Sequence, residues 1–447
     1  MMPFKPVLLW SDLLFFLLLA ATLAGGWLAA RTEHLRLSWR RVGQSRVAMA
    51  AATLLLAFVA VALLDSLHYR ERLPGAKENY AVEVRSALDA LLSGLRTRQE
   101  RTYSAPLATH LFAKESLEGD QGRDFPRLKH GGAHLGGDVA GREGDIARQM
   151  LQGLGFGLIA WFALWLLLVP LRRAAPHLAW DAVLGTLLAL CLAAGPLAVL
   201  AQGYHVLGTD KVGQDVLYLT LKSIRTGLLI GTLTTLIMLP AAVLLGILAG
   251  YAGGWIDDVI QYLYTTLNSI PGVLLIAAAV LMMQVVIDTH PEWFATSAER
   301  ADARLLALCA ILGITSWTGL CRLLRGETLK LRELEYVQAA RALGVSGVRI
   351  LWRHILPNVM HIVMIAIVMD FSGLVLAEAV LSYVGIGVDP HTISFGTMIN
   401  TARMELAREP MVWWSLAAAF VFMFVLVLAA NLFADVVRDA FDPRAAR

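Results

Sequence analysis

The sequence predicts an all-α membrane protein, and two observations support this fold class. Hydrophobic residues make up 57% of the 447-residue chain and charged residues only 16%, whereas a soluble domain carries roughly a quarter of its residues as charge. The apolar residues also gather in long runs, about as long as the roughly 20 residues that a helix needs to cross a bilayer. So much apolar surface does not fit into one water-soluble core, so we expect lipid to be the second solvent.

About nine transmembrane helices are expected along the chain. The apolar runs lie near residues 7–30, 47–64, 153–170, 180–201, 223–250, 264–287, 304–324, 360–382 and 411–433. The net charge of +3 is too small for this length to indicate nucleic acid. The three cysteines, Cys191, Cys309 and Cys321, lie in or beside these runs. We interpret them as small packing residues rather than as a disulfide framework or a thiolate metal site.

The orientation follows from the Lys and Arg residues of the short loops, which gather on the cytoplasmic side of a membrane. Basic residues crowd segments 31–46, 172–173 and 322–353. All three segments fall on one side if the spans alternate, which predicts an external N-terminus and a cytoplasmic C-terminus. Alternatively, the first apolar run is a cleaved signal peptide with Lys5 as its basic start. Cleavage would leave segment 31–46 outside, against the charge rule, so we prefer a membrane anchor.

Residues 65–150 form a long polar excursion, which this topology places outside. Apolar residues recur at helical spacing over residues 80–98 and predict one amphipathic helix; they are Val84, Leu88, Leu91, Leu92 and Leu95. Glycines between residues 131 and 141 indicate an irregular loop. His130, His134 and Asp138 have a spacing that would suit a metal on a helix, but in this glycine-rich segment we prefer a solvated loop and predict no metal site.

The most informative stretch is the basic loop over residues 326–357. Its sequence predicts a short helix from Glu335, then a break at Gly344, which suits the left-handed residue that ends a helix. A second short helix follows, and Pro357 fits the first turn of the next span. Val337, Ala340 and Leu343 are expected on one face, with small Ala339 beside them, so that another surface can approach closely. The residues alone leave a docking element and an ordinary amphipathic connector equally open.

This stretch resembles the "EAA" loop of the membrane subunits of bacterial ABC importers. The family pattern is Glu-Ala-Ala, three residues, Gly, nine residues, then Ile-x-Leu-Pro. The chain has Gln338 where Glu is usual and His354 where Ile is usual, and the peptide branch of the family commonly reads His-Ile-Leu-Pro-Asn, as here. The residues that the resemblance assigns to an ATPase-coupling loop are Glu335, Gln338, Ala339, Ala340, Arg341, Gly344, Leu356 and Pro357.

Four further segments resemble the dipeptide, oligopeptide and nickel permeases of the same branch. Residues 207–217 are similar to its external signature, with Gly208, Thr209, Asp210, Gly213 and Asp215 in place and Gln214 where Arg is usual. Residues 249–257, 376–388 and 435–444 match later motifs in order. The resemblance covers about residues 205–444 and implies a type I ABC importer transmembrane domain.

The N-terminal part departs from the family pattern, which places one span before the external signature, whereas four are expected here. This predicts four regions. Residues 1–64 are an anchor region of two spans, 65–150 an external insertion, 151–204 two additional spans, and 205–447 the permease core with its cytoplasmic loop 326–357. Asp210 and Asp215 would face outside, where they either meet a binding protein or cap a helix.

The resemblance implies a permease subunit that carries peptides or a related small solute across a prokaryotic plasma (inner) membrane. The chain lacks a Gly-x-x-x-x-Gly-Lys-Ser/Thr loop for phosphate. ATP and Mg are therefore expected on separate cytoplasmic subunits, this chain binds no cofactor, and it is not an enzyme. The other implied partners are a second homologous permease, an external substrate-binding protein and membrane lipid.

Polar residues inside the expected spans are candidates for the transport pathway or for structural hydrogen bonds, since each is costly in lipid. Glu378 is the sharpest candidate, with Asp370, His361 and Ser382 on the same span. The others are Asn268, Ser269 and Gln284, with Pro271 at the start of their span. For Glu378 we prefer a structural hydrogen bond.

Two other functions remain open. The same fold could serve an ABC-type exporter, and a neighbouring gene for a binding protein would decide between import and export. From a different class, a self-sufficient channel or ion-coupled carrier would work without ATP or partners and would show inverted repeats, which the sequence does not show. A membrane-embedded enzyme would need a polar catalytic cluster, which the scattered single residues do not supply.

Overall fold

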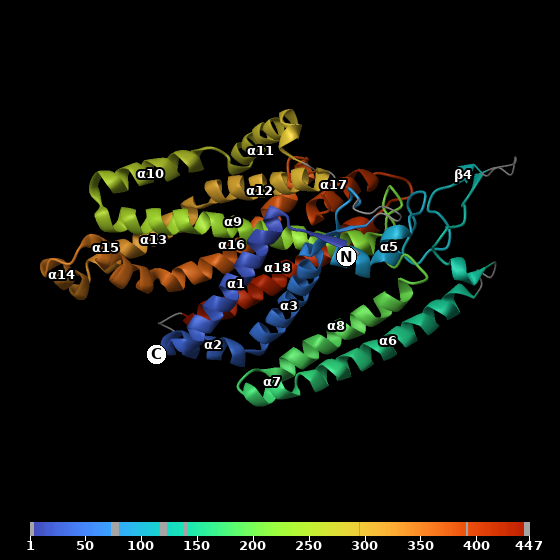
Figure 1. Cartoon of the computed structure of the whole chain (residues 1–447), viewed down its shortest axis with the longest axis horizontal. Helices are drawn as coiled ribbons and strands as arrows, with labels where there is room; N and C mark the ends of the chain where they lie inside the picture. Colours follow the sequence, from blue (N-terminus) through green and yellow to red (C-terminus); the bar gives the residue numbers. More distant parts are fainter. Residues whose placement is uncertain are drawn as a thin grey trace.

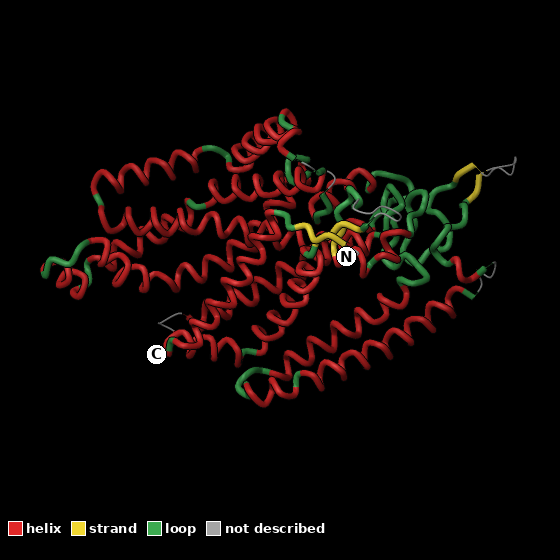
Figure 2. The backbone as a smooth tube through the Cα atoms, in the orientation of Figure 1, coloured by secondary structure: helices red, strands yellow, loops and turns green. Residues whose placement is uncertain are grey.

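The computed structural model describes residues 4–72, 80–116, 123–136, 141–294, 296–389 and 392–441, without the side chains of residues 28–30 and 34. Most of this chain is helical (Figure 2). In the described residues, nine helical segments are long and apolar enough to cross a membrane, which confirms the predicted number. They are α1 (Trp10–Arg31), α3 (Arg46–Ser66), α6 (Arg142–Leu167), α8 (Trp180–Leu200), α9 (Val216–Ala252), α11 (Gly272–Thr289), α12 with α13 (Ser297–Ser316, Thr318–Arg332), α16 (Leu356–Val384) and α18 (Trp414–Phe441).

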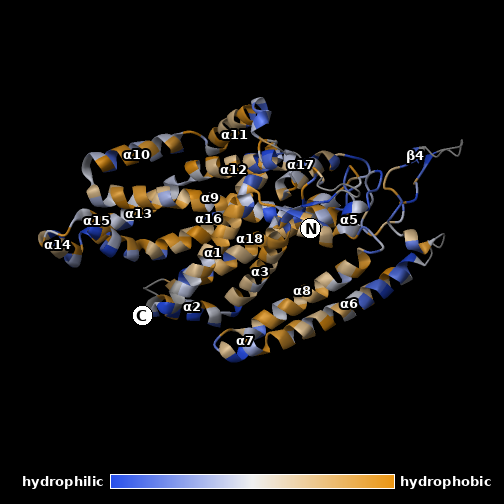
Figure 3. Ribbon diagram, viewed as in Figure 1, coloured by the Kyte–Doolittle hydropathy of each residue, from blue (hydrophilic) through white to orange (hydrophobic). Residues whose placement is uncertain are grey.

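The shorter elements connect the spans at two ends of the molecule (Figure 1). On the side drawn to the left and below lie α2 (Glu33–Gln44), α7 (Val169–Ala174) at the lower turn of its hairpin, α14 (Glu335–Ala342), α15 (Gly347–Ile350) and η3 (Leu351–Ile355). We call this the α14 end. All three basic segments lie there, as simple alternation of the spans predicts. Figure 3 shows the corresponding pattern, with hydrophobic helices between polar ends.

The opposite end, which we call the sheet end, holds the strands and most of the irregular backbone. A three-stranded antiparallel sheet joins β1 (Phe4–Val7), β2 (His68–Glu71) and β3 (Arg85–Ser86), with Phe4 opposite Glu71. A separate hairpin pairs β4 (Glu115–Ser116) with β5 (Arg123–Asp124). The remaining short helices here are α4 (Ala87–Leu91), α5 (Ser93–Thr97), η1 (Ala133–Leu135), η2 (Pro291–Trp293) and α17 (Phe395–Glu405).

The prediction of one helix over residues 80–98 is wrong. Strand β3 occupies Arg85–Ser86, and Ser86 then caps α4 together with Asp89 in a reciprocal pair of hydrogen bonds. The helix is interrupted at Leu92, and α5 follows. Leu88 and Leu95 are buried, whereas Leu91 is 70% exposed. The apolar spacing was therefore real for part of the segment, but pairing with β2 and the cap at Ser86 determine where the helix begins.

The glycine-rich segment is irregular as predicted, within the residues described. It forms a turn and the single 3₁₀ turn η1, flanked by Gly132 and Gly136 with positive φ. His134 lies against Asp145, 2.7 Å from its carboxylate. In the described part of the chain, no three His, Cys, Asp or Glu side chains are arranged so that they could hold a metal ion. Asp138 lies outside the described residues, as do residues 442–444 of the C-terminal motif.

The sixth span is shorter than the predicted 264–287. Helix α10 (Gly254–Ser269) ends before it, Ile270 is extended, and α11 begins at Gly272. Pro271 explains the break, because a proline disfavours helical backbone in the residue before it and removes a hydrogen-bond donor. Asn268 and Ser269 therefore end the preceding helix instead of opening the span.

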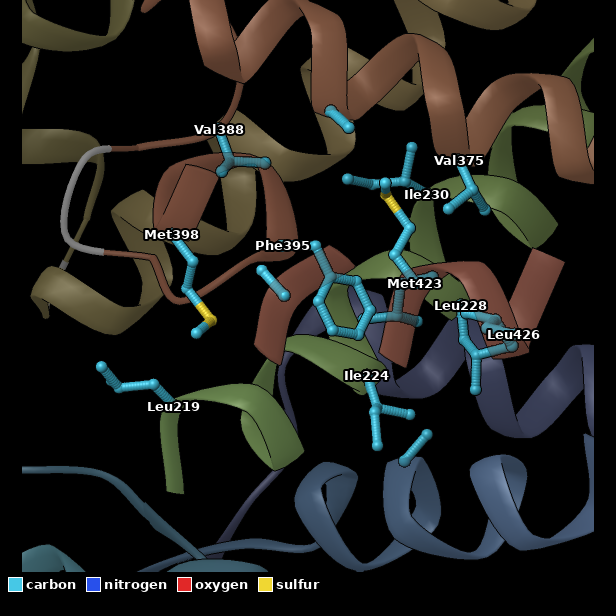
Figure 4. Close-up of a cluster of buried hydrophobic side chains, with 14 of the residues drawn as sticks. Leu219, Ile224, Leu228, Ile230, Val375, Val388, Phe395, Met398, Met423 and Leu426 are labelled. Atoms are coloured by element: carbon cyan, nitrogen blue, oxygen red, sulfur yellow. The ribbon is translucent and has the colours of Figure 1, made fainter. Parts of the chain in front are cut away.

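Helix α9 forms the centre of the fold and contacts α3, α12, α13, α16 and α18. Glycines allow the closest approaches: Gly231 faces Phe371 on α16, and Gly250 faces Thr328 on α13. Near the sheet end, Phe395 of α17 is buried with side chains of α9 and α18, among them Ile224 and Leu426 (Figure 4). This packing anchors the loop before α17 to the membrane core.

Helix α1 is held at its first turn by polar contacts to two other helices, α9 and α12. Ser11 and Asp12 are buried. Arg225 of α9 donates from Nη2 to the Ser11 hydroxyl (3.0 Å) and to Asp12 Oδ1 (2.6 Å). The Ser11 amide donates to Asp302 of α12 (3.1 Å). Without α1, Arg225 would lose this ion pair.

Candidate functional site

The loop over residues 326–357 places the short helix α14 at the extreme tip of the α14 end (Figure 1). Gly344 ends this helix with φ +77°, a conformation that side chains with a Cβ rarely adopt. Its amide donates to the Arg341 carbonyl and the next amide, of Val345, donates to the Ala340 carbonyl. The glycine break predicted from the sequence thus has the geometry of a helix C-cap.

The inner side of the loop is buried. Val337, Ile350 and Ile355 are 2%, 0% and 0% exposed and belong to one apolar cluster with residues of α9 and α16. The Asn358 amide donates to the Tyr336 hydroxyl (3.1 Å) and to the His354 carbonyl (2.6 Å). The chain passes through a single π-helical turn, η3, before Leu356 and Pro357 begin α16. The loop is thereby attached to α9 through the apolar cluster and to α16, which continues directly from it.

The outer side of α14 is open. Gln338, Ala339 and Arg341 are exposed, and Ala340 is half-buried. Gln338 turns back along the chain and donates to the Glu333 carbonyl (3.2 Å). The prediction that Leu343 shares a face with Val337 is wrong, because Leu343 is 84% exposed. Six residues of α-helix turn through about 600°, which places the two side chains roughly 120° apart.

An ion pair and a close helix contact hold the base of the loop. Arg325 of α13 donates to both carboxylate oxygens of Asp257 on α10, at 2.6 and 2.7 Å. These hydrogen bonds hold the pKa of Asp257 below its usual value. Nearby, a Cβ on Gly250 of α9 would lie 2.7 Å from the Arg325 carbonyl. Helices α9, α10 and α13 therefore meet at the point from which the loop projects.

The polar residues of the spans do not converge on one cluster. Glu378 is 1% exposed and accepts hydrogen bonds at Oε1 from Ser382 (2.7 Å) and Ser394 (3.0 Å). Ser394 also caps α17, so Glu378 links α16 to that helix. Asp370 and His361 are half-buried on α16, and among the described residues neither side chain has a hydrogen-bonding partner.

The other three candidates lie near α11. Asn268 accepts a hydrogen bond from Thr318 (3.0 Å), which connects the end of α10 to α13. The Ser269 hydroxyl donates to backbone carbonyls of its own helix. Gln284 borders a small cavity together with Arg304, and Arg304 is paired with Asp288 and Asp389. Each of these contacts can be explained by local packing.

The external signature forms a tight turn in front of α9. Gly208 and Gly213 have positive φ. Asp210 Oδ1 accepts from the amides of Val212 and Gln214, and Asp215 Oδ1 accepts from the Leu217 amide at the start of α9. Thr209 is buried and donates to the Thr102 carbonyl (2.9 Å). Asp215 thus caps a helix, one of the two predicted alternatives.

Sequence reasoning missed the buried charges that join the insertion to α9. Glu100 accepts from the amides of Lys129, His130 and Gly131 (2.7–3.1 Å). His205 lies 3.3 Å from Glu100 and 2.7 Å from Asp215. Burial opposes the charge on His205, but the hydrogen bonds to Asp215 and Glu100 outweigh it and raise its pKa to about 9. Burial also opposes the charge on Glu100, whereas its hydrogen bonds lower its pKa to about 2.

A second such contact lies beside it. Lys222 of α9 donates to Asp89 (2.8 Å) and lies 3.1 Å from Asp65. Asp89 is buried, which raises its pKa, but the Lys222 charge and further hydrogen bonds lower the pKa to about 2. The partners are more than 100 residues apart in sequence, and no local pattern could have paired them.

Comparison with known proteins agrees with the motifs. Residues 242–447 match the family model for the binding-protein-dependent transport system inner membrane component. Over 239 residues, 54% of this chain and 76% of the relative, the sequence is 34% identical to the oligopeptide transport system permease protein OppC of Mycobacterium tuberculosis. It is 34% identical over 242 residues to the glutathione transport system permease protein GsiD of Pectobacterium atrosepticum, covering 54% of this chain and 73% of that protein.

The fold was also matched to a solved structure of the methionine ABC transporter MetNI in inward-facing conformations, and the match covers 50% of this chain and 97% of the matched MetNI chain. The TM-score is 0.37 and the sequence identity 17%.

Proposed function

Because this chain belongs to the binding-protein-dependent transport system inner membrane component family, we propose that it imports peptides or a related small solute, driven through its loop at residues 326–357. The chain is a multi-pass protein of the inner membrane and the permease subunit of an ATP-binding-cassette importer. Members of this family are permeases without a cofactor, and their ATPase is a separate subunit. The relatives named for oligopeptide and glutathione transport support the peptide class of solute.

The observation that carries the coupling proposal is the two-sided character of α14. On one side, the buried Val337 packs in the apolar cluster with residues of α9 and α16. On the outer side, Gln338, Ala339 and Arg341 are exposed at the tip of the molecule. Small Ala339 lets a partner approach the backbone, and the exposed Leu343 offers an apolar contact. Such a surface fits a groove on a cytoplasmic ATP-binding subunit.

The coupling would work as a two-state motion. Closure of the ATP-binding subunits, which hold ATP and Mg, would displace α14, and the rigid attachment of the loop would pass that displacement to α13 and α16. A ligand shifts such an equilibrium only by its differential affinity for the two states. In this proposal ATP favours one arrangement of the spans, and its hydrolysis restores the other.

The proposed orientation places the α14 end in the cytoplasm and the sheet end outside. The concentration of basic residues at the α14 end supports it. A substrate-binding protein would then dock at the sheet end, near residues 65–150 and the turn at 208–215, and a second homologous permease would complete the pathway within the lipid. We also propose the four-region division at residues 64, 150 and 204. Glu378 and Asp370 remain pathway candidates on α16.

Substitution of Gly344 by Asp tests the coupling. A Cβ at Gly344 meets no described atom within 4 Å, so the new side chain would intrude only on a docked partner, besides straining the positive φ. We expect Gly344→Asp to insert and yet to abolish uptake of a labelled peptide and substrate-stimulated ATPase activity in the complete complex.

Gly385→Asp is the matched control, because Gly385 also has positive φ (87°) and open space around it but lies at the opposite end of α16. It carries the same backbone strain without the proposed contact and should retain at least half of the ATPase stimulation. Full stimulation in Gly344→Asp would show that the docking assignment is wrong. Efflux instead of uptake in the wild type would identify an exporter.

A further inference from the structure

A large apolar cavity lies between the additional helices and the permease core. Its volume is about 800 Å³, within the range of about 300–1,000 Å³ typical of small-molecule and cofactor sites. Spans α3, α8, α9 and α18 form its walls, and α4 and α5 close it at the sheet end. We call it the hairpin cavity, because α6 and α8 pack together as a helical hairpin beside the core (Figure 1).

The hairpin is fixed to the rest of the chain at both ends. At the α14 end, Asp181 pairs with Arg46 (2.7 Å) and the Ala179 amide donates to the Gly43 carbonyl (2.8 Å). At the sheet end, Arg98 of the insertion donates to the carbonyls of Ala201 and Gln202, which follow α8. Helix α8 is thus attached to the rest of the chain at both of its ends, and these contacts hold it in place beside the cavity.

The cavity lies within one half of the membrane-spanning region. Its lining includes Leu54 to Val61 of α3, Leu217 to Ile224 of α9, and Val421 to Val425 of α18. Apart from Leu54, which lies near the middle of α3, these residues belong to the half of their helix nearer the sheet end. An occupant would therefore be exposed to one leaflet of the bilayer and not to the other.

The wall is chemically two-sided. Among the lining residues, Arg98 carries the only charge and Gln202 the only side-chain amide; the rest are apolar side chains or glycine. Both polar residues lie at the sheet end. Nη1 of Arg98 makes the two carbonyl contacts, while its Nε and Nη2 groups have no hydrogen-bond partner among the described residues. An apolar body with a cationic end is complementary to an acyl chain attached to an anionic head.

We propose that the hairpin cavity binds an anionic phospholipid of the leaflet at the sheet end. One acyl chain lies between α8 and the core, and the phosphate accepts hydrogen bonds from Arg98. The acyl chain would fill the space between α8 and α9, but because lipid tails are as apolar as the cavity wall, its burial alone gives little preference for this site over the bilayer. Recognition therefore depends on the headgroup, since Arg donates to phosphate oxygens in a fixed fork.

Photolabelling of the full chain tests this site. The protein is reconstituted into bilayers that contain phosphatidylglycerol with a photoreactive group on one acyl chain, or phosphatidylcholine with the same chain. Mass spectrometry then locates the labelled peptides. We expect the peptides around Ala194 and Leu221 to be labelled about 10-fold more by phosphatidylglycerol than by phosphatidylcholine, a ratio that corresponds to a difference in binding free energy of about 1.4 kcal/mol.

Three variants separate the cavity from the general lipid surface. Ala194→Trp fills the cavity and should reduce its labelling at least fivefold. Ile159→Trp is the matched control, because Ile159 is 66% exposed on α6 and does not line the cavity; its labelling should equal that of the wild type. Arg98→Gln should bring the ratio between the two lipids close to one.

The wild-type measurement alone can overturn the proposal, so it does not depend on the folding of any variant. Equal labelling by the two lipids would exclude recognition of the anionic headgroup. Labelling of the cavity peptides at or below that of the outer face of α6 would exclude an acyl chain in the cavity.

Discussion

At the scale of single residues, the buried charges at the sheet end show how the insertion is held. Glu100 satisfies three consecutive backbone amides and His205 as well. His205 in turn contacts Asp215, which caps α9. One imidazolium therefore connects the insertion, the external turn and the first turn of the central helix. Paired buried charges of this kind are costly to break, because removal of one partner leaves the other without compensation.

This arrangement predicts a dependence of stability on pH. The pKa of His205 is raised to about 9, so its contribution is complete below the unfolded value of about 6.5 and is lost as the pH rises through about 9. Glu100, with its pKa lowered to about 2, contributes above about pH 4.5 and loses its effect as the pH falls towards 2. His205→Gln should cost about 3 kcal/mol near neutral pH.

Thermal unfolding of the purified protein between pH 5 and pH 10 measures this effect. The difference in melting temperature between wild type and His205→Gln should be largest at pH 5–6.5 and should shrink through pH 9. His290→Gln, at the end of α11, serves as a control and should follow the wild type. A difference that does not change with pH would show that His205 is not held as a charged partner.

Glu378 allows a second prediction at this scale. If it is a structural link between α16 and α17, Glu378→Gln keeps an acceptor for Ser382 and Ser394 and should retain both stability and uptake. Glu378→Ala leaves two buried hydroxyls without that acceptor and should destabilise the protein by about 1–3 kcal/mol. Thermal unfolding and peptide uptake are measured together. Loss of uptake in Glu378→Gln at an unchanged melting temperature would instead assign Glu378 to the transport pathway.

At the scale of elements, hydropathy predicted which segments span the membrane, because the length and composition of a span are local properties. It did not predict where helices break. Pro271 interrupts the expected sixth span, and strand β3 with the cap at Ser86 replaces the start of the expected helix at 80–98. Pro271 and Ser86 are both visible in the sequence, but the prediction gave more weight to the helical spacing of the apolar residues around them. The loop at 326–357 was predicted in more detail, since Gly344 and Pro357 mark its boundaries directly.

The contact between α9 and α13 yields a prediction about the base of this loop. A Cβ on Gly250 would lie 2.6 Å from the Thr328 Cβ and 2.7 Å from the Arg325 carbonyl. Gly250→Ala should therefore force the two helices apart and lower the free energy of unfolding by about 1–3 kcal/mol. Gly326→Ala is the control, because a Cβ at Gly326 on α13 meets nothing within 4 Å. It should stabilise the helix by roughly 0.5–1 kcal/mol.

Melting temperature and peptide-stimulated ATPase activity of the complex report the two effects. We expect Gly250→Ala to lower both and Gly326→Ala to lower neither. Equal behaviour of the two variants would mean that the close approach of α9 and α13 does not position the loop.

At the scale of the whole molecule, the sequence predicted the C-terminal half better than the N-terminal half. Ordered motifs and alternating spans were sufficient for residues 205–441. The insertion, by contrast, is held by pairs such as Lys222 with Asp89 and His205 with Glu100, and by strand β1 pairing with β2 across about 60 residues. These contacts join residues that are distant in sequence, and the individual residue types would be equally suited to a solvated surface. Residues 65–150 therefore pack against α9 and the turn before it, through contacts that the sequence did not predict.

The orientation of the molecule is the remaining whole-molecule prediction, and it decides whether α14 can meet a cytoplasmic ATPase. Two exposed side chains mark the ends: Leu343 at the α14 end (84% exposed) and Val82 at the sheet end (78% exposed). In a variant with Cys191, Cys309 and Cys321 replaced by Ser, expressed without the ATP-binding subunits that would cover Leu343, a single cysteine is introduced at either position. Because basic loops stay in the cytoplasm, an impermeant maleimide added to intact cells or spheroplasts should label Val82→Cys and not Leu343→Cys. After permeabilisation it should label both. The cysteine-free variant gives the background, and labelling of Leu343→Cys in sealed cells would place α14 outside, where no ATP-hydrolysing partner could reach it.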